Sequence, residues 1–567
     1  MSYMPSLTKK IIHGKPYYYL RECQRVDGRP KIVWTHYIGS AQNLLDKLTH
    51  PEPLRVSVRE FGASAASFAI AQSLNIVEII DRHVPKQGSQ GPSVGQYLLV
   101  ATLNRCVCPT SKVKLGDWYD KTVLRRLMPL SSSQLISQRF WDNMDRVSEQ
   151  NIRQIEQEIV AQCVSEFKLN LNMLLFDCTN FFTFADSFND QSELPQRGHG
   201  KEGRANLRIV GLALMVTSDG DVPLFHQTYA GNQHDSETFG SVVDQIAARC
   251  RLISEEVTDI TLVFDKGNNS DDNLEAVERG PWHFVGSLVP THHSDLLKIQ
   301  KKEMRRLDTR KLPGVWSTRL QKEVFGVERT VLVTWNKALY EAQHKTLERE
   351  IQKRQIKLKQ IQKRLEKKTA KGKQPTVEGT QKQIQMLLKA RHMKDLFYAK
   401  VSAGGKRPRL SFHFQEKEWQ KLKNTLLGKN ILFTDHKEWS DEDIVLAYRA
   451  QHHVESAFRR MKDPHYLTFR PTFHWTDQKL RVHAFTCVLA LMIVSLMRRK
   501  LLQAGLDMSC VQLLDQLSEI QEVDLVYALP EKTKKISIRT VISETNDSQK
   551  KMMKALGLSQ YLAKARN

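Results

Sequence analysis

The stretch between residues 171 and 289 constrains the fold most, because strand-like and helix-like segments alternate there in a definite order. Five of its segments are apolar and rich in β-branched residues, and two segments between them have the composition of helices. The expected strands are 171–177, 207–217, 222–230, 259–265 and 282–289, and the expected helices are 236–251 and 270–279. Three strands, a helix, a strand, a helix and a strand therefore follow one another, which predicts a layered α/β core.

That order is typical of an RNase H-like α/β core, and the sequence predicts that an insertion interrupts it. Strand-like residues at 310–335 are followed by a long basic helix at 337–368 and a second helix at 381–396. Apolar residues in the first of these helices have coiled-coil spacing. The predicted fold class is thus an α/β RNase H-like core with a β-plus-coiled-coil insertion and N-terminal β and helical modules, multidomain α+β overall.

The charge balance favours a polyanionic partner. The chain has 85 Lys and Arg against 62 Asp and Glu, a formal net charge of +23. Nucleic acid is the commonest partner for such an excess, although a basic protein without one remains an alternative. The excess is concentrated at 345–373, with twelve basic residues against three acids. This segment is either a solvated coiled-coil hairpin or an arm that contacts DNA phosphates, and its self-repulsion favours the arm.

At 567 residues the chain is too long for one hydrophobic core, so several domains are expected. A strand-rich start with an Asp27-Gly28 turn predicts a β-hairpin, and helical periodicity follows it. The expected units are a small basic β-hairpin module (1–50), a helical DNA-binding or dimerisation region (51–165), the first part of the core (166–300), the insertion domain (301–429), the second part of the core with the catalytic helix (430–500) and a C-terminal region (501–567).

Cysteine usage and hydropathy suggest a soluble cytoplasmic protein. The eight cysteines are scattered, with no CxxC pair, and are expected to be reduced and mostly buried. The N-terminus lacks the apolar run of a secretory signal. The most apolar stretch, 484–497, would span only about 21 Å as a helix, short of the ~30 Å of a bilayer interior. We expect it to be a buried core helix.

Two aspartates end buried strands in matching contexts. Asp177 directly follows an apolar run, and Asp265 follows another. Carboxylates at the C-terminal ends of strands lie at the rim where α/β sheets bind ligands. Each one alone is more often a turn former or a helix cap. If the two strands are neighbours, both carboxylates can reach one divalent ion, and the metal site and the turn or cap are then equally favoured.

The third acid is expected on a helix that begins at Ser440. Four polar residues, at offsets of 3, 4 and 7, lie along one stripe of this helix: Tyr448, Gln451, Glu455 and Lys462. An apolar row beside the stripe is expected to bury the helix against the sheet: Val454, Phe458 and Met461. A carboxylate beside such a seam favours a bound cation at Glu455, the alternative being an edge glutamate that reaches solvent.

These motifs resemble bacterial insertion-sequence transposases with an Asp-Asp-Glu site, in the class with a Tyr-x2-Arg-x3-Glu-x6-Lys signature. Tyr448, Glu455 and Lys462 match that spacing, whereas Gln451 stands in the arginine position. The resemblance covers about 170–300 and 430–495. Its other pieces are the Asp177-x-Thr179 opening, RGHGKEGR (197–204), Gly231-Asn232 with Asp235-Ser236, the Asp265-x-Gly267 turn and the helix at 470–493.

The resemblance implies cleavage at the ends of a mobile element and joining of the freed 3′-hydroxyl to target DNA. Asp177, Asp265 and Glu455 would be the catalytic acids and would hold Mg²⁺, for which Mn²⁺ can substitute. Residues expected to contact DNA are Tyr448, Gln451, Arg459 and Lys462, with weaker phosphate binding by Gln451 than by an arginine. The implied partners are terminal inverted repeats and target DNA, bound by a homodimeric synaptic complex. The implied location is the bacterial cytoplasm, with the protein on the nucleoid when it is bound to DNA.

Three alternatives remain at this point. An RNase H-like nuclease without strand transfer would need the same acids. An inactive DNA-binding relic would retain the fold, and Gln451 leaves room for it. Zinc held by His199, His234, His452 or His453 is less favoured, because the two consecutive histidines cannot share one face of a helix.

Overall fold

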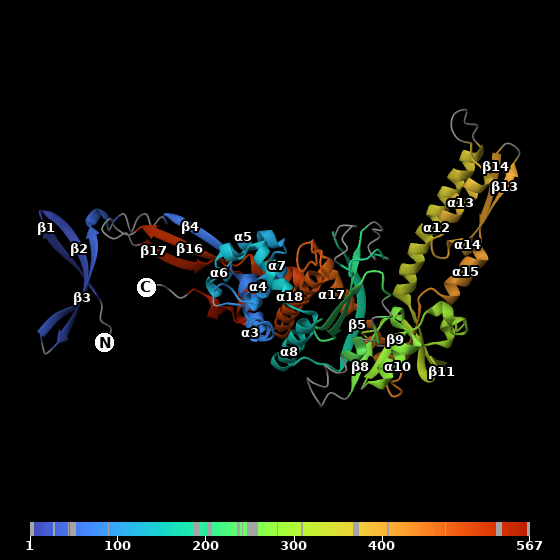
Figure 1. Ribbon diagram of the computed structural model, residues 1–567, viewed down its shortest axis with the longest axis horizontal. Helices are drawn as coiled ribbons and strands as arrows, with labels where there is room; N and C mark the ends of the chain where they lie inside the picture. The colour runs from blue at the N-terminus through green and yellow to red at the C-terminus, as the bar shows by residue number, and fades with distance from the viewer. Residues whose placement is uncertain are drawn as a thin grey trace.

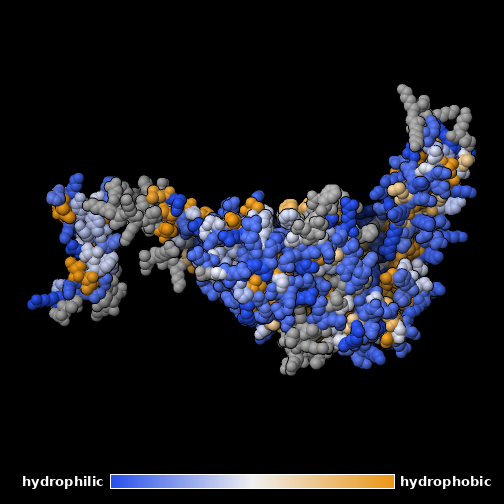
Figure 2. Space-filling model, in the orientation of Figure 1, coloured by the Kyte–Doolittle hydropathy of each residue, from blue (hydrophilic) through white to orange (hydrophobic). Residues whose placement is uncertain are grey.

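The chain is described by a computed structural model with a small N-terminal sheet at one end, a projecting arm at the other, and a helical region and a large sheet between them (Figure 1). Figure 2 shows that most of the visible surface is hydrophilic, with hydrophobic side chains gathered on the N-terminal sheet and along the arm. The structure describes residues 5–563 apart from 27–28, 44, 46–52, 89, 185–191, 199, 201–206, 235–236, 238, 241, 246–258, 281, 308–309, 367–373, 405–406, 471 and 529–535.

The N-terminal module is a three-stranded antiparallel sheet, one strand more than the expected hairpin. Strands β1 (Ser6–Ile12), β2 (Lys15–Val26) and β3 (Arg29–Ser40) lie in the order β1-β2-β3. His13 and Gly14 turn the chain between β1 and β2 with φ of 49° and 76°. The expected Asp27-Gly28 turn lies outside the described residues.

The helical region surrounds α18 (Asp477–Gln503), which contacts α2, α4, α7 and α8. Its helices are α2 (Gly62–Ser73), α3 (Ile76–His83), α4 (Val94–Val107), α5 (Leu115–Asp120), α6 (Leu124–Leu127), α7 (Ser137–Asp145) and α8 (Glu149–Phe167). In the described part of the chain, α18 is long and apolar enough to cross a membrane, as is the bent pair of α2 and α3 taken as one span. The most apolar window of α18 is 94% buried inside the protein, as expected for a core helix.

The C-terminal region returns to the helical region, so 51–165 is not helical throughout. Strand β4 (Arg55–Glu60) pairs with β16 (Gln521–Ala528), which pairs with β17 (Ile536–Ile542). The helices here are α19 (Cys510–Ser518) and α20 (Asp547–Ala555). Short 3-10 helices occur at η1 (Lys112–Lys114), η2 (Ser132–Gln134), η3 (Lys266–Asn268), η4 (Pro290–His292), η5 (Lys301–Glu303) and η6 (Leu558–Tyr561).

A nine-stranded mixed sheet forms the centre of the molecule, with the strand order β10-β11-β12-β15-β9-β8-β5-β6-β7. Strands β5, β8 and β9 are parallel to one another, and the other pairs are antiparallel. The strands are β5 (Met173–Phe182), β6 (Ile209–Thr217), β7 (Pro223–Ala230), β8 (Ile260–Val263), β9 (Trp282–Ser287), β10 (Arg305–Leu307), β11 (Val315–Val324), β12 (Val327–Asn336) and β15 (Lys429–Thr434). Every residue of β6 is buried between β5 and β7, and α17 packs against this strand. Helices α10 (Asp271–Arg279) and α11 (Ser294–Leu297) connect strands on this side.

The insertion is shorter than the expected 301–429. Strands β11 and β12 extend the central sheet, because β12 pairs with β15 and β15 pairs with β9. This pairing covers the backbone of β9, which would otherwise be an open sheet edge. The insertion proper therefore begins with α12.

The arm consists of α12 (Lys337–Glu366), α13 (Val377–Leu387), α14 (Met393–Leu396), β13 (Phe397–Gly404), β14 (Arg407–Phe414) and α15 (Glu416–Thr425). It has a small core of its own, in which four of the five expected coiled-coil positions, Ile351, Leu358, Ile361 and Leu365, are buried and the fifth, Leu347, is partly buried. The second helix, expected at 381–396, instead spans Val377–Leu387 and is followed by the short α14. Figure 1 shows the arm projecting away from the sheet.

The helix expected from Ser440 is two helices, α16 (Asp441–Arg449) and α17 (His452–Lys462). Ser440 is the N-cap of α16, as expected, and its hydroxyl accepts a hydrogen bond from the Asp443 amide. The break puts Tyr448 on α16 and Glu455 on α17, so the polar stripe is not one continuous helical face.

Candidate active site

Asp177, on β5, and Asp265, two residues after the end of the adjacent parallel strand β8, stand at matching positions. Strand β5 continues to Phe182, so Asp177 lies within the strand. The sequence had predicted that the strand ends at Asp177. Its pairing with β8, however, ends at Leu175↔Val263, and both aspartates follow that last pair at the same distance along the chain. Because paired strands lie about 4.8 Å apart, the two acids share the edge where β8 leaves β5.

Two hydroxyl groups orient the Asp265 carboxylate. The Ser287 hydroxyl, at the end of β9, donates to Asp265 Oδ1 at 2.9 Å, and the Tyr448 hydroxyl donates to the same oxygen at 3.1 Å. Burial, with a contribution from the carboxylates of Asp265 and Glu455, raises the pKa of Tyr448 well above its ordinary value. Tyr448 is therefore a neutral donor to Asp265, and its hydroxyl is not available for the DNA contact that the sequence had predicted.

Helix α17 lies along β5, held by a polar contact near each end. The Gln451 amide donates to the carbonyl of Phe176 at 2.8 Å, and Lys462 Nζ donates to the Thr179 hydroxyl at 2.8 Å. These two strand residues flank Asp177, and Glu455 lies one helical turn after Gln451. The exposed Glu455 therefore lies on the part of α17 between these two contacts, near enough to Tyr448 to contribute to the raised pKa of that tyrosine.

Gln451 does not have the role that the sequence predicted. Its side chain is buried, with 8% exposure, and its amide is bonded to the strand backbone, so it does not face a DNA phosphate in this structure. Arg459, on the same helix, is exposed, as a DNA-contacting residue must be. The apolar row beside the stripe is buried, as expected, at Val454, Phe458 and Met461.

A buried aspartate that sequence reasoning missed holds α17 from the other side. Asp221, in the turn before β7, has a side-chain exposure of 3% and pairs with both His453 and Arg460. Its backbone carbonyl accepts a hydrogen bond from Ser495 of α18 at 3.1 Å. Burial acts to raise the pKa of Asp221, but the contacts from His453 and Arg460 outweigh it and hold that pKa below its ordinary value. Asp221 therefore fixes the position of the helix that carries Glu455.

The three acids supply the hard oxygen donors that Mg²⁺-type ions prefer. The carboxylate oxygens of the three acids do not all lie within 4.8 Å of one another, however. Among the described residues, the one group of His, Cys, Asp and Glu side chains with ligand atoms all within 4.8 Å is His283, Asp435 and His436. That group lies at the opposite end of β8 and β9, since Thr261 pairs with His283 there. Ion binding at the three acids would therefore require their side chains to move closer together.

The histidines considered for zinc do not form a site in the described part of the chain. His453 contacts Asp221, and His452 Nδ1 lies 2.8 Å from the carbonyl of Arg449. His199 lies outside the described residues. His453, two residues before Glu455, therefore has a structural role, because it pairs with the buried Asp221 that holds α17.

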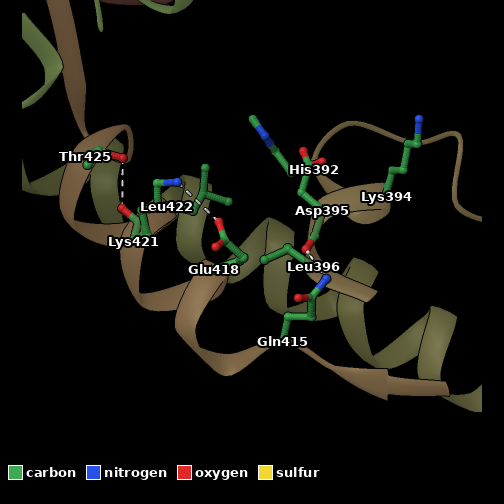
Figure 3. A pocket seen from close by; sticks show the side chains of 9 residues that line it. All are labelled: His392, Lys394, Asp395, Leu396, Gln415, Glu418, Lys421, Leu422 and Thr425. Atoms are coloured by element: carbon green, nitrogen blue, oxygen red, sulfur yellow. Dashed lines mark hydrogen bonds and ion pairs between the residues drawn. The ribbon is translucent and has the colours of Figure 1, made fainter. Parts of the chain in front are cut away.

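Two pockets lie in the arm, and none of the three acids lines either of them. Figure 3 shows a pocket of about 530 Å³ where α14 faces α15, lined by side chains of both charges, among them Lys394, Asp395, Glu418 and Lys421. A groove of about 850 Å³ between α12 and α13 has five cations among its lining residues: Lys353, Arg354, Lys357, Arg364 and Lys382. Two of them, Lys353 and Arg354, pair with Glu350 outside the lining. The groove, unlike the pocket, is suited to a polyanion.

Comparison with known families identifies the chain. The sequence profile described as "Transposase DDE domain" matches residues 183–493, more than half of the 567 residues. Asp265 and Glu455 lie inside the matched segment, and Asp177 lies just before it. The chain belongs to the DDE transposase family.

This DDE transposase is thus a DNA-binding enzyme that cleaves and joins DNA strands, in a family that uses divalent metal ions. A search of curated proteins found no match. Among solved structures, the transposase is similar to a piggyBac transposase in a synaptic complex with hairpin DNA. The two share 9% identity over 80% of this chain and 79% of that one, with a TM-score of 0.38.

Proposed function

We propose that this transposase moves a bacterial insertion sequence and that Asp177, Asp265 and Glu455 are its catalytic acids. The observation that carries the proposal is the matching position of the two aspartates beyond the last β5–β8 pair. The contacts of Gln451 and Lys462 with β5, which bring Glu455 alongside, support it further. Tyr448, Glu455 and Lys462 also keep the spacing of the Tyr-x2-Arg-x3-Glu-x6-Lys class.

The same proposal assigns an RNase H-like core to the sheet. Three consecutive antiparallel strands, β5, β6 and β7, are followed by β8 and β9 on the other side of β5 and parallel to it. The order β7-β6-β5-β8-β9 supports the assignment, with β15, β12, β11 and β10 as an extension of the sheet.

The proposed ion is Mg²⁺, with Mn²⁺ as a substitute, because all the donors are carboxylates. Asp177, Asp265 and Glu455 would together hold the ions. Two such ions stabilise the entering and leaving oxygens of an in-line displacement at phosphorus. Within the chain, Tyr448 and Ser287 hold Asp265 in one orientation, and Asp221 holds the helix of Glu455.

Cleavage and joining are the same displacement with different oxygens. In cleavage, water attacks the phosphorus and the bond to the 3′-oxygen breaks, which leaves a 3′-hydroxyl on the element. In joining, that 3′-oxygen attacks a target phosphodiester, and the target strand's own 3′-oxygen leaves. Lys462, held on Thr179, and the exposed Arg459 place positive charge where these phosphates pass.

We further propose that the transposase acts in the bacterial cytoplasm as a homodimer that holds two terminal inverted repeats and target DNA. The cation-lined groove of the arm supports a long contact with the DNA backbone.

Three variants test the site: Asp177→Asn, Asp265→Asn and Glu455→Gln. Each is expected to abolish Mg²⁺-dependent cleavage of a terminal-repeat oligonucleotide while DNA affinity stays within about threefold of wild type. Glu438→Gln, which changes an exposed carboxylate outside the site, is the matched control. Substantial cleavage by any of the three variants overturns the assignment of that residue.

A strand-joining assay with the wild-type protein separates this proposal from its two alternatives. Joined products support a transposase with a complete reaction. Cleaved ends without joining indicate a nuclease, and DNA binding without cleavage indicates a relic.

A further inference from the structure

A small basic cavity lies between the helical region and the segment that follows α17. Its volume is about 220 Å³. It is lined by Arg105 of α4, Lys112 of η1, Trp141 of α7 and the segment residues Phe473, His474 and Trp475. The catalytic acids are not among its lining residues, so the cavity is separate from the site above.

Three cations line the cavity. Lys479 pairs with Asp145 at 2.5 Å, whereas Arg105 and Lys112 are buried. Arg105 is 2% exposed and Lys112 is 7% exposed. Among the described residues, Arg105 donates to three backbone carbonyls, those of Thr110, Thr468 and Arg470. Within the part of the chain that the structure describes, neither Arg105 nor Lys112 has a carboxylate partner. Burying a cation without a counter-charge is costly, so the site is suited to an anion.

The ionisation of the neighbouring groups agrees with this picture. Burial and the nearby Arg105 lower the pKa of Lys112 to about 7. Burial and the same two cations lower the pKa of His474 to about 3, so that His474 is neutral. An anion in the cavity would restore full protonation of Lys112.

Aromatic side chains surround the mouth of the cavity. Phe473 is 62% exposed and Trp475 is 59% exposed, and both flank the buried His474. Large aromatic rings on the surface beside cations are the combination that binds nucleotides, with rings against bases or sugars and cations against phosphates.

The segment that lines the cavity is attached to the strand of Asp177. The Phe469 ring stacks on Phe181 with centroids 4.2 Å apart, and the Phe184 amide donates to the carbonyl of Thr472 at 3.0 Å. From Asp177 to Phe182 the strand covers roughly 16 Å at about 3.3 Å per residue, the length of about five base steps. DNA engaged at Asp177 would reach the mouth of the cavity a few nucleotides away.

We propose that this cavity binds one phosphate group of the transposase's DNA, with Phe473 and Trp475 against the adjoining nucleotide. The proposal rests on the DNA binding of the family and not on the assignment of the three acids. It can therefore be tested in the Glu455→Gln background, in which failure of cleavage does not affect the measurement.

The test compares Lys112→Met with Lys114→Met, an exposed lysine of the same 3-10 helix outside the cavity. DNA affinity is measured between 50 and 200 mM salt. Lys112→Met is expected to weaken binding about three- to tenfold and to lower the salt slope by about one phosphate contact, while Lys112→Arg restores both. Lys114→Met is expected to have the smaller effect. Equal effects of the two methionine variants, or none at Lys112, overturn the proposal.

Two further measurements complete the test. Trp475→Ala removes an exposed ring and is expected to weaken DNA binding without loss of thermal stability, so it serves if Lys112→Met fails to fold. Tryptophan fluorescence is then titrated with inorganic phosphate and with duplex DNA. A response to DNA that Lys112→Met abolishes supports the proposal. A response to inorganic phosphate alone, with DNA binding unchanged in the variants, assigns the cavity to a free anion and overturns it.

Discussion

Replacing Tyr448 with phenylalanine tests how the protein controls its second aspartate. The substitution removes one hydroxyl, whose contacts are Asp265 Oδ1 at 3.1 Å and the Ser287 hydroxyl at 3.0 Å, and it leaves the ring in place. Asp265 keeps the donor from Ser287 at 2.9 Å. The expected result is a weaker but not absent activity, because the carboxylate loses one of two donors to the same oxygen.

The magnitude follows from the type of bond that is lost. A hydrogen bond to a charged group is worth about 1.5–3 kcal/mol, which corresponds to roughly 10- to 150-fold in an equilibrium or a rate. Loss of a group that orients a metal ligand costs about 10- to 100-fold in metal affinity or activity. Since Ser287 remains, we expect the lower part of this range, about 10- to 30-fold in the Mg²⁺ concentration for half-maximal cleavage.

The assay is cleavage of a terminal-repeat oligonucleotide across a Mg²⁺ series, with DNA affinity measured in parallel. Tyr466→Phe is the matched control, because it also removes a Tyr–Asp hydrogen bond, of 2.6 Å, but to Asp515, which is not one of the three acids. Tyr448→Phe should raise the Mg²⁺ requirement, and Tyr466→Phe should not. If both variants show the same Mg²⁺ dependence as wild type, Tyr448 does not orient a metal ligand and the reasoning is refuted.

Two other substitutions test the contacts that hold α17 in place. Gln451→Arg restores the residue of the family signature, but it places a charge at a site that is 8% exposed and has no carboxylate among the described contacts of Gln451. The free energy of unfolding should therefore fall by about 1–3 kcal/mol, with no gain in DNA affinity. Tighter DNA binding at an unchanged free energy of unfolding would contradict this. In Asp221→Asn, the asparagine tolerates the backbone φ of 58° at this position, but the charged pairs with His453 and Arg460 are lost. The free energy of unfolding should therefore fall by about 3–5 kcal/mol, and cleavage should fall more than DNA binding. Calorimetry and the cleavage assay measure both effects, and a stable, fully active Asp221→Asn would show that α17 is held by its apolar face alone.

Patterns with a short period were predicted well from the sequence. Apolar runs that end in Asp177 and Asp265 marked two strands that prove to be parallel neighbours. The spacing of Val454, Phe458 and Met461 correctly identified the buried face of the helix. These features depend on residues a few positions apart, whose geometry local backbone periodicity sets.

Features that depend on distant pairing were not predicted. Strand β5 extends past Asp177 because β6 pairs with it as far as Phe182↔Ile209, and nothing in the composition of 178–182 requires that partner. Strands β11 and β12 join the central sheet through β15, about a hundred residues further on. Likewise, Gln451 occupies a position that the signature assigns to DNA contact, but its side-chain amide donates a hydrogen bond to the Phe176 carbonyl.

The sequence by itself determined which residue types are available for chemistry and on which kind of element each one lies. Only the tertiary structure decided how those elements face one another: that Tyr448 turns toward Asp265, that Asp221 holds the helix of Glu455, and that Lys112 is buried beside Arg105 without an acid. The physical reason is that spacing along the chain sets local direction, whereas burial, ion pairing and strand register depend on which segments the fold packs against one another.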